Sequence, residues 1–156
     1  MRRQNKPLIF ASREHPSSTT PPRTVLVDDS KEFLKILCAL LEDMITIVGT
    51  AGNGTQAVTA AANLRPQLVI MDINMPEMDG LSAARLIRQN NSGTGVVLMS
   101  GEDSSTLRQQ CRSCGAHAFI HKSKLRRELP RVLQEVLAGA RLRQFPTNSH
   151  PKGQTA

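Results

Sequence analysis

Short apolar runs recur along the chain, and polar or amphipathic segments separate them. Each run has the length of a β-strand and contains few polar side chains. A strand covered on both faces has this composition, whereas a half-exposed strand alternates apolar and polar residues. The pattern therefore predicts buried strands at residues 24–27, 45–48, 68–71, 96–99 and 116–120.

Apolar side chains spaced three and four residues apart fill the intervals between these runs. This spacing places them on one face of a helix, which can then pack on a core. Ser30 precedes the first such stripe and is a suitable helix cap. The predicted helices cover residues 33–44, the Ala-rich segment from Asn53 to just before Pro66, and residues 81–88, 104–114 and 125–137.

Strands that alternate with helices predict an α/β fold, because parallel neighbouring strands need crossover connections. A doubly wound sheet in the flavodoxin-like order 2-1-3-4-5 is one of two common solutions for this pattern. In that order the first and third strands flank the point where the winding reverses. Ligands of such sheets bind at the carboxyl ends of these strands.

A chain of 156 residues has the size of one ordinary domain. The predicted helices and strands place this domain at residues 23–142. Residues 1–22 are basic and rich in Pro, Ser and Thr, and residues 143–156 are similarly poor in apolar side chains. Such segments bury too little apolar surface to fold by themselves, so we expect a disordered N-terminal arm and a disordered C-terminal tail.

The cysteines and the apolar runs bear on the cellular compartment. Three cysteines are too few and too uneven in number for a disulfide framework, which favours reduced thiols in a cytoplasmic protein. No apolar run approaches the roughly 20 residues that span a bilayer, so no membrane insertion is expected. Cys111 and Cys114 fit half of a zinc site, a redox pair or two small core residues on one helix face. The core interpretation is favoured because no second ligand pair is evident.

The formal charge of +7 raises the question of nucleic-acid binding. The excess is concentrated near the ends, with eight basic and two acidic residues from Lys122 onward. The chain has no Trp or Tyr and only four Phe, so it lacks an aromatic set that could stack on bases. We therefore expect a solvated basic face and basic tails, and no nucleic-acid binding by this domain alone.

Acidic residues follow two of the predicted strands where each strand ends. Asp28 and Asp29 come directly after the first run, and Asp72 comes directly after the third. A single aspartate in such a place is often a turn or helix cap. Three carboxylates at adjacent strand ends repel one another unless a cation binds between them. Mg²⁺ prefers carboxylate oxygens and often bridges to phosphate, so the trio predicts a magnesium site.

Two further polar residues are predicted at the same edge of the sheet. Ser100 ends the fourth run and Lys122 follows the fifth. Alone, they would be interpreted as a turn residue and a surface charge. Together with the carboxylates they supply the parts of a phosphoryl-transfer site, whose transition state is stabilised by positioning and by cations. An aspartate can be the nucleophile and form an aspartyl phosphate.

Four segments of the chain resemble the receiver domains of bacterial response regulators. They are VLVDDS (25–30), VIMDINMPEMDGL (69–81), VVLMSGED (96–103) and GAHAFIHKS (115–123). The resemblance covers roughly residues 23–140. It implies a CheY-like fold with five parallel strands in the order 2-1-3-4-5.

By this resemblance, Asp72 is the phosphoacceptor. Asp29 and Asp72 match direct Mg²⁺ ligands, and Asp28 matches an outer-shell or water-bridged ligand. The backbone carbonyl of Asn74 is implied as a further ligand. The resemblance also implies that Ser100 and Lys122 contact the phosphoryl oxygens.

The resemblance implies a switch and a hydrolysis activity as well. Phe119 matches an aromatic side chain that turns inward as the Ser100 position moves toward phosphate, although the residues alone favour a plain core role. Asn74 and Glu102 match positions that tune hydrolysis, as in the chemotaxis single-domain receiver. We therefore expect a self-phosphorylating acceptor with autophosphatase activity rather than an enzyme of the usual turnover type.

One residue departs from the common receiver pattern. Many receivers have proline, in a cis bond, after the lysine, whereas Ser123 follows Lys122 here. This substitution leaves the geometry of the lysine open. A lysine without proline, together with VGTAGNGTQAV (48–58), is similar to the NarL type of receiver. That type normally carries a helix-turn-helix output domain, and only a short tail follows the last predicted helix.

We therefore expect a single-domain response regulator of a two-component system or phosphorelay. A histidine kinase or His-phosphotransfer protein would be the donor, an unknown protein would be the downstream partner, and a homodimer on phosphorylation is a candidate assembly. Two alternatives stay open. One is a phosphorylation-independent interaction module, and the other is the receiver fragment of a DNA-binding regulator.

Overall fold

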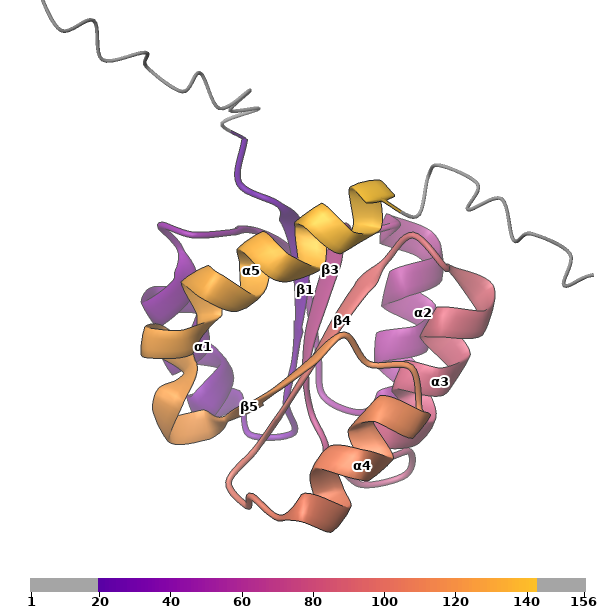
Figure 1. Cartoon of the computed structure of the whole chain (residues 1–156). Helices are drawn as coiled ribbons and strands as arrows, with labels where there is room; N and C mark the ends of the chain where they lie inside the picture. Colours follow the sequence, from indigo (N-terminus) through magenta and orange to yellow (C-terminus); the bar gives the residue numbers. More distant parts are fainter. Residues whose placement is uncertain (1–19, 143–156) are drawn as a thin grey trace, which may run out of the picture.

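The computed structural model of the chain describes residues 20–142 (Figure 1). The expected arm at 1–22 and tail at 143–156 therefore lie outside the described residues, apart from residues 20–22. At that end of the described chain, the carbonyl of Pro21 accepts a hydrogen bond from the Thr46 hydroxyl and the carbonyl of Pro22 accepts one from the Thr46 amide. The chain thus enters the fold beside the second strand.

Strands and helices alternate along residues 23–142, as the apolar pattern predicts. The elements are β1 (Arg23–Val27), α1 (Lys31–Leu41), β2 (Thr46–Ala51), α2 (Gly54–Leu64), β3 (Leu68–Asp72), α3 (Gly80–Asn90), β4 (Gly95–Ser100), α4 (Ser105–Ser113), β5 (Ala118–His121), a 3-10 turn η1 (Lys122–Lys124) and α5 (Leu125–Leu142). The predicted second strand is shorter than β2, since residues 49–51 also pair with residues 25–27 of β1. Within the described residues, no helix is long and apolar enough to cross a bilayer.

The strands form one parallel sheet in the order β2-β1-β3-β4-β5. The prediction of a flavodoxin-like α/β fold is therefore confirmed. The register pairs Val27 of β1 with Met71 of β3, and Asp72 with Met99 of β4. The carboxyl ends of β1, β3 and β4 consequently lie side by side, where the winding reverses.

The sheet separates two hydrophobic clusters. Helices α1 and α5 cover one face, and α2, α3 and α4 cover the other (Figure 1). Alternate residues of each strand enter opposite clusters, so Val25 lies in one and Leu26 in the other. Every residue of β3 is buried, which explains why this strand is a continuous apolar run in the sequence.

Polar side chains fix the first turns of the helices that follow the strands. Ser30 accepts a hydrogen bond from the Phe33 amide at 3.1 Å, which confirms it as the cap of α1. Asn53, Asp79 and Ser104 accept equivalent bonds at the starts of α2, α3 and α4. These bonds satisfy amides that have no partner inside the helix. The caps thereby set where each helix begins above the carboxyl edge of the sheet.

Gly80 allows α3 to start directly against the end of β3. Its amide donates a 2.8 Å hydrogen bond to the carbonyl of Ile73. A Cβ atom at this position would overlap the carbonyl oxygen of Asp72 and lie 2.8 Å from the Cα of Ile73. The close approach involves backbone on both sides, which cannot move aside as a flexible side chain would.

We expect Gly80→Ala to lower the free energy of unfolding by about 1–3 kcal/mol, the usual cost of overpacking, although alanine is the better helix former. Urea denaturation measures this change. Gly93→Ala is the matched control, because a Cβ atom there meets nothing within 4 Å. Equal stability of the two variants would contradict the assigned clash.

Candidate functional site

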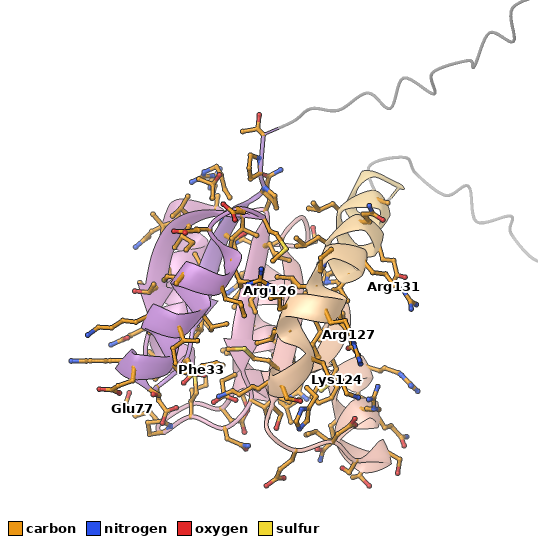
Figure 2. The ribbon with its side chains drawn as sticks, turned by 90° about the vertical axis from the view of Figure 1, so that its left-hand side faces the viewer. Phe33, Glu77, Lys124, Arg126, Arg127 and Arg131 are labelled. Atoms are coloured by element: carbon orange, nitrogen blue, oxygen red, sulfur yellow. The ribbon has the colours of Figure 1, made fainter. Side chains whose placement is uncertain are left out.

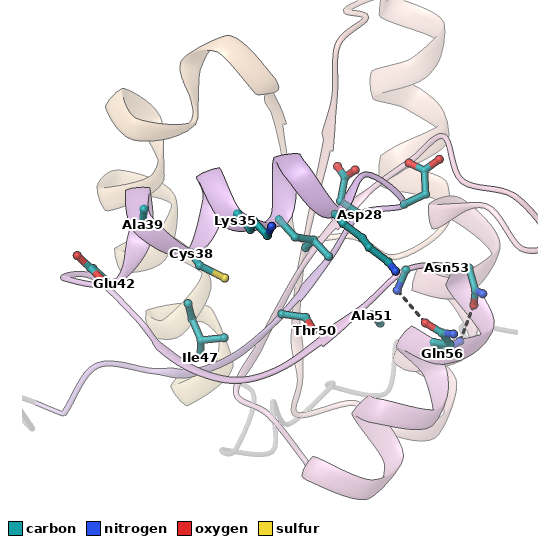
Figure 3. A pocket seen from close by; sticks show the side chains of 14 residues that line it. Asp28, Lys35, Cys38, Ala39, Glu42, Ile47, Thr50, Ala51, Asn53 and Gln56 are labelled. Atoms are coloured by element: carbon teal, nitrogen blue, oxygen red, sulfur yellow. Dashed lines mark hydrogen bonds between the residues drawn. The ribbon is translucent and has the colours of Figure 1, made fainter.

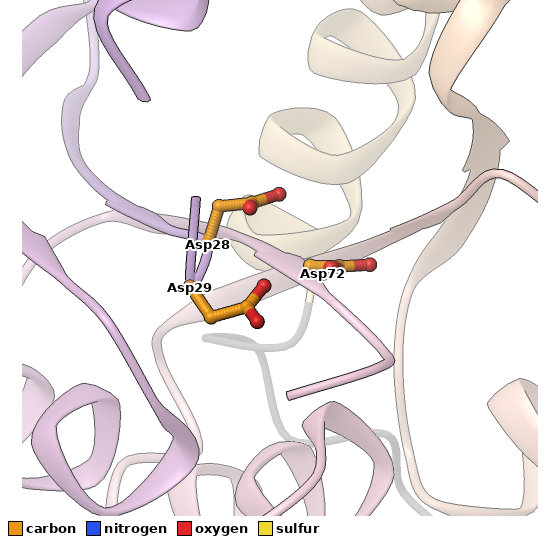
Figure 4. Close-up of side chains that lie close together, drawn as sticks. All are labelled: Asp28, Asp29 and Asp72. Atoms are coloured by element: carbon orange, nitrogen blue, oxygen red, sulfur yellow. The ribbon is translucent and has the colours of Figure 1, made fainter. Parts of the chain in front are cut away.

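The three predicted acids meet at the carboxyl edge of the sheet (Figure 4). One carboxylate oxygen from each of Asp28, Asp29 and Asp72 lies within 4.8 Å of the others. Asp28 and Asp72 are buried, and Asp29 is exposed. The backbone places them, because Asp28 follows β1, donates its amide to the Ala51 carbonyl at 3.1 Å, and stands beside the end of β3. Such a cluster needs a compensating positive charge.

Lys122 supplies part of that charge. Its Nζ atom lies 2.8 Å from Oδ2 of Asp28 and 3.2 Å from Oδ2 of Asp72. Burial alone would lower the pKa of Lys122, but the hydrogen bond and charge of Asp28, together with the charge of Asp72, raise it above the ordinary lysine value. The ammonium group therefore stays charged between the two buried carboxylates.

The position of Lys122 also answers the question that Ser123 raises. Residues 122–124 form the 3-10 turn η1, and the Ser123 amide donates to Nδ1 of His121 at 3.3 Å. No cis peptide bond occurs within residues 20–142. The lysine thus reaches the acids from a 3-10 turn, without a following proline.

The donor set fits a hard divalent cation. Three carboxylates carry more negative charge than one ammonium group neutralises, and within the described residues Asp29 forms no ion pair. Carboxylate oxygens are the preferred ligands of such cations. The site can therefore hold a metal ion through Asp28, Asp29 and Asp72. Asn74 lies just beyond β3 with an exposed side chain, and its backbone hydrogen-bonds the Asp72 carboxylate.

Ser100 and Glu102 lie on the neighbouring strand end and loop. Ser100 is the last residue of β4 and is fully buried. Its hydroxyl oxygen accepts a 3.0 Å hydrogen bond from the Glu102 amide. The side chain of Glu102 is exposed. In this state the serine hydroxyl stabilises the loop after β4.

Phe119 lies in β5, half-buried between the sheet and α4. The Arg108 guanidinium of α4 lies 5.3 Å from the centre of its ring. The same guanidinium donates two hydrogen bonds of 2.6 Å to the carboxylate of Asp103, in the loop after β4. Sequence reasoning missed Arg108, because helical periodicity marks it only as an exposed polar residue. The sequence does contain one indication of this contact. Arg108 follows Asp103 by five residues, and a helix that begins at Ser105 brings the two side chains together.

His121 forms a second connection to that loop. Its Nε2 atom lies 2.8 Å from the Gly101 carbonyl, and its Nδ1 atom lies 2.7 Å from the Ser123 hydroxyl. Because a carbonyl can only accept, Nε2 is the donor in the first bond. The end of β5 is thereby tied to the loop that follows Ser100.

A groove with a volume of about 870 Å³ continues from the acids along α1 (Figure 3). It lies between α1, β2 and the start of α2, and its apolar wall includes Leu34, Cys38 and Ile47. Its lining also includes Lys31, Lys35 and the acids Asp28 and Asp29. The acidic site is consequently accessible from the α1 side.

Two of the three cysteines do not line this groove and belong to the hydrophobic cluster that α2, α3 and α4 cover. Cys111 and Cys114 are each 3% exposed, and the Cys114 thiol donates to the Cys111 carbonyl. Burial raises the pKa of Cys111 to about 11, so its thiol stays protonated at neutral pH. Both residues are core residues, as the sequence favours.

The electrostatics of the acids predict how stability depends on pH. Burial raises the pKa of Asp72, the charge of Asp28 raises it further, and Lys122 opposes both. The folded chain thus holds the Asp72 proton more tightly than the unfolded chain does. Stability from this residue is present below the ordinary aspartate pKa of 3.8 and is lost as pH rises through the folded-state pKa.

Without divalent cations, we expect Asp72→Asn to raise the midpoint of thermal unfolding at neutral pH. The advantage should shrink as pH falls toward the ordinary aspartate pKa, because the wild-type carboxyl is then protonated. Thermal unfolding followed by circular dichroism at a series of pH values measures it, with the exposed Asp43→Asn as control. A gain that is the same at every pH would contradict this account of Asp72.

Comparison with known proteins agrees with this geometry. The family model of the response regulator receiver domain matches residues 24–134. The chain is 38% identical over 140 residues to a protein-glutamate methylesterase/protein-glutamine glutaminase of Alkalilimnicola ehrlichii, covering 83% of this chain and 36% of that protein. The chain therefore corresponds to about a third of that relative's length.

Two solved structures show the same likeness in three dimensions. The receiver domain of the putative response regulator NarL from Mycobacterium tuberculosis gives a TM-score of 0.68 at 27% identity, covering 78% of this chain and 98% of that domain. The CheX-CheY-BeF3-Mg complex from Borrelia burgdorferi gives a TM-score of 0.66 at 30% identity, covering 77% of this chain and 90% of the matched chain. From the family match, the strand order and the acidic site, we conclude that the chain belongs to the response regulator receiver domain family.

Proposed function

We propose that this chain acts as the receiver of a response regulator and that its Asp72 accepts a phosphoryl group in a Mg²⁺-dependent reaction. The observation that carries the proposal is the contact of Lys122 with both Asp28 and Asp72, inside a cluster of carboxylates that fits a cation. The donor is a phosphohistidine of a histidine kinase or His-phosphotransfer protein. An Asp72 carboxylate oxygen forms the new bond to phosphorus, the phosphorus–nitrogen bond breaks, and the imidazole leaves with a proton.

Residues of the acidic cluster would bind the ion. Asp28, Asp29, Asp72 and the backbone carbonyl of Asn74 are the proposed magnesium site. When bound, Mg²⁺ neutralises charge on the phosphoryl oxygens. The similar complex from Borrelia burgdorferi contains Mg and BeF3, which supports the assignment by analogy.

The remaining site residues have proposed roles in the reaction and afterwards. Lys122 already lies next to Asp72, so a short movement would let its ammonium group contact a phosphoryl oxygen. Ser100 would have to give up its bond to the Glu102 amide to donate its hydroxyl to the phosphoryl group. Asn74 and Glu102 have exposed side chains near this edge, where they can tune hydrolysis of the aspartyl phosphate.

Phosphorylation would change the conformation of the surface formed by α4, β5 and α5. A movement of Ser100 changes the loop that Asp103 and His121 also hold, and Arg108 links this loop to Phe119. The exposed side chains of Arg126, Arg127 and Arg131 project from α5 (Figure 2). Basic side chains favour a downstream partner with an acidic surface, or a second copy that presents acids. We place this activity in the cytoplasm.

Acetyl phosphate with Mg²⁺ should add one phosphoryl group to the wild-type chain and none to Asp72→Asn. Asp72 is the only proposed nucleophile, and its amide analogue cannot form the acyl phosphate. Intact-protein mass spectrometry measures the addition. Asp43→Asn, an exposed aspartate distant in sequence from the motifs, should be modified like the wild type. An unmodified wild-type chain, or modification of Asp72→Asn, would refute the proposal.

Loss of the Arg108 side chain should favour the phosphorylated-state conformation. Arg108 contacts both Phe119 and Asp103 in this structure, so Arg108→Gln is expected to remove stabilisation mainly from the unphosphorylated state. We expect beryllofluoride, an acyl phosphate mimic, to bind about two- to fivefold more tightly, as measured by titration calorimetry.

Arg112→Gln is the matched control for this substitution, because Arg112 is also an exposed arginine of α4 and, among the described residues, forms no ion pair. Its affinity for beryllofluoride should equal that of the wild type. Unchanged or weaker binding by Arg108→Gln would contradict the role of Arg108.

A further inference from the structure

We propose that the ring of Phe33 positions the Lys122 ammonium group for phosphoryl transfer, an inference that rests on the proposed function. Phe33 lies in the first turn of α1, on the side of the molecule that α1 and α5 share (Figure 2). Nζ of Lys122 lies 4.3 Å from the centre of its ring. An ammonium group at this distance from an aromatic face is attracted by the ring quadrupole.

The lysine needs such a contact because little else restrains it on that side. Its side chain is a flexible chain of four carbons that leaves a 3-10 turn, and a quarter of it (25%) is exposed to solvent. Its two carboxylate contacts are on Asp28 and Asp72. The Phe33 ring supplies a third, uncharged contact and keeps water from part of the ammonium group.

A closed series of contacts fixes the ring relative to the site. Oδ1 of Asp28 accepts a hydrogen bond of 2.9 Å from the Ser30 amide, and the Ser30 hydroxyl accepts one of 3.1 Å from the Phe33 amide. Phe33 contacts Lys122, and Lys122 returns to Oδ2 of Asp28 at 2.8 Å. Asp28 therefore aligns both the first turn of α1 and the lysine. The ring and the ammonium group cannot be displaced independently.

Core packing alone does not require an aromatic residue at this position. Leu37 and Leu41 of the same helix stripe are fully buried, whereas Phe33 is only half-buried. A leucine would continue the apolar stripe but would offer no ring face to the ammonium group. The ring also differs from the carboxylates in one respect. Its attraction for Lys122 does not depend on the charge of Asp72, so it persists after that carboxylate has become an acyl phosphate.

The test varies the electron density of the ring without changing its shape. Phenylalanine analogues with one, two and three fluorine atoms are introduced at position 33, since fluorine weakens the attraction of the ring face for a cation. The rate of Asp72 phosphorylation by acetyl phosphate should fall stepwise along the series. Phe33→Leu should be about three- to tenfold slower than the wild type while its urea unfolding shows an intact fold.

A double-mutant cycle separates positioning from structure. If Phe33 acts through Lys122, then Phe33→Leu should slow phosphorylation in the wild-type background and have no further effect in Lys122→Met. A flat fluorine series, or an equal effect of Phe33→Leu in both backgrounds, would overturn the inference.

A readout without phosphorylation distinguishes this inference from the proposed function. The methylene protons next to Nζ of Lys122 should be shifted upfield by the ring in the metal-free wild type, and this shift should disappear in Phe33→Leu. A wild type that shows the shift but is not phosphorylated refutes the proposed function and retains the contact. A phosphorylated wild type without the shift refutes only the role of Phe33.

Discussion

The attraction between Lys122 and two buried carboxylates is the interaction on which the rest of the site depends. Asp28 directly follows β1 and Asp72 ends the neighbouring β3, and their charges would repel each other at the edge of the sheet without a cation. Lys122 directly follows the edge strand β5, so its contacts also connect β5 and η1 to the ends of β1 and β3. The two ion pairs therefore reduce the repulsion between the carboxylates and also hold the segment after β5 against the ends of β1 and β3.

The sequence predicted the fold and the acidic cluster because both follow from simple periodicities. Continuous apolar runs such as Val69–Met71 indicate strands that are covered on both faces, and alternation with helices requires a parallel sheet. Once the strands are parallel, residues at their carboxyl ends must meet at one edge, so the sequence alone predicts that Asp28 and Asp72 lie together. Ser30 could be identified as a cap for the same local reason.

Contacts between side chains that are distant in the sequence were beyond such reasoning. Helical spacing marks Phe33 only as part of an apolar stripe, and nothing in the sequence around it indicates that Lys122 lies over its ring. His121 and Gly101 are brought together by the pairing of β4 with β5 and by the path of a loop, neither of which has a period. The length of β2 was underestimated because Gly49 and Thr50 interrupt the apolar run, while pairing with β1 decides the strand.

The central position of β3 has a consequence for how a chemical event at Asp72 can spread. This strand is buried along its whole length and hydrogen-bonded on both sides, to β1 and β4. Its amides should therefore exchange with solvent only when the whole domain unfolds, whereas the loop after β4 can open locally. Asp72 is thus attached to a strand that is buried throughout and paired on both sides, as the neighbouring β4 also is. If this carboxylate is phosphorylated, as proposed, we expect the adjustment in the side chains of Ser100 and Lys122 and in the loops at this edge, rather than in β3 itself.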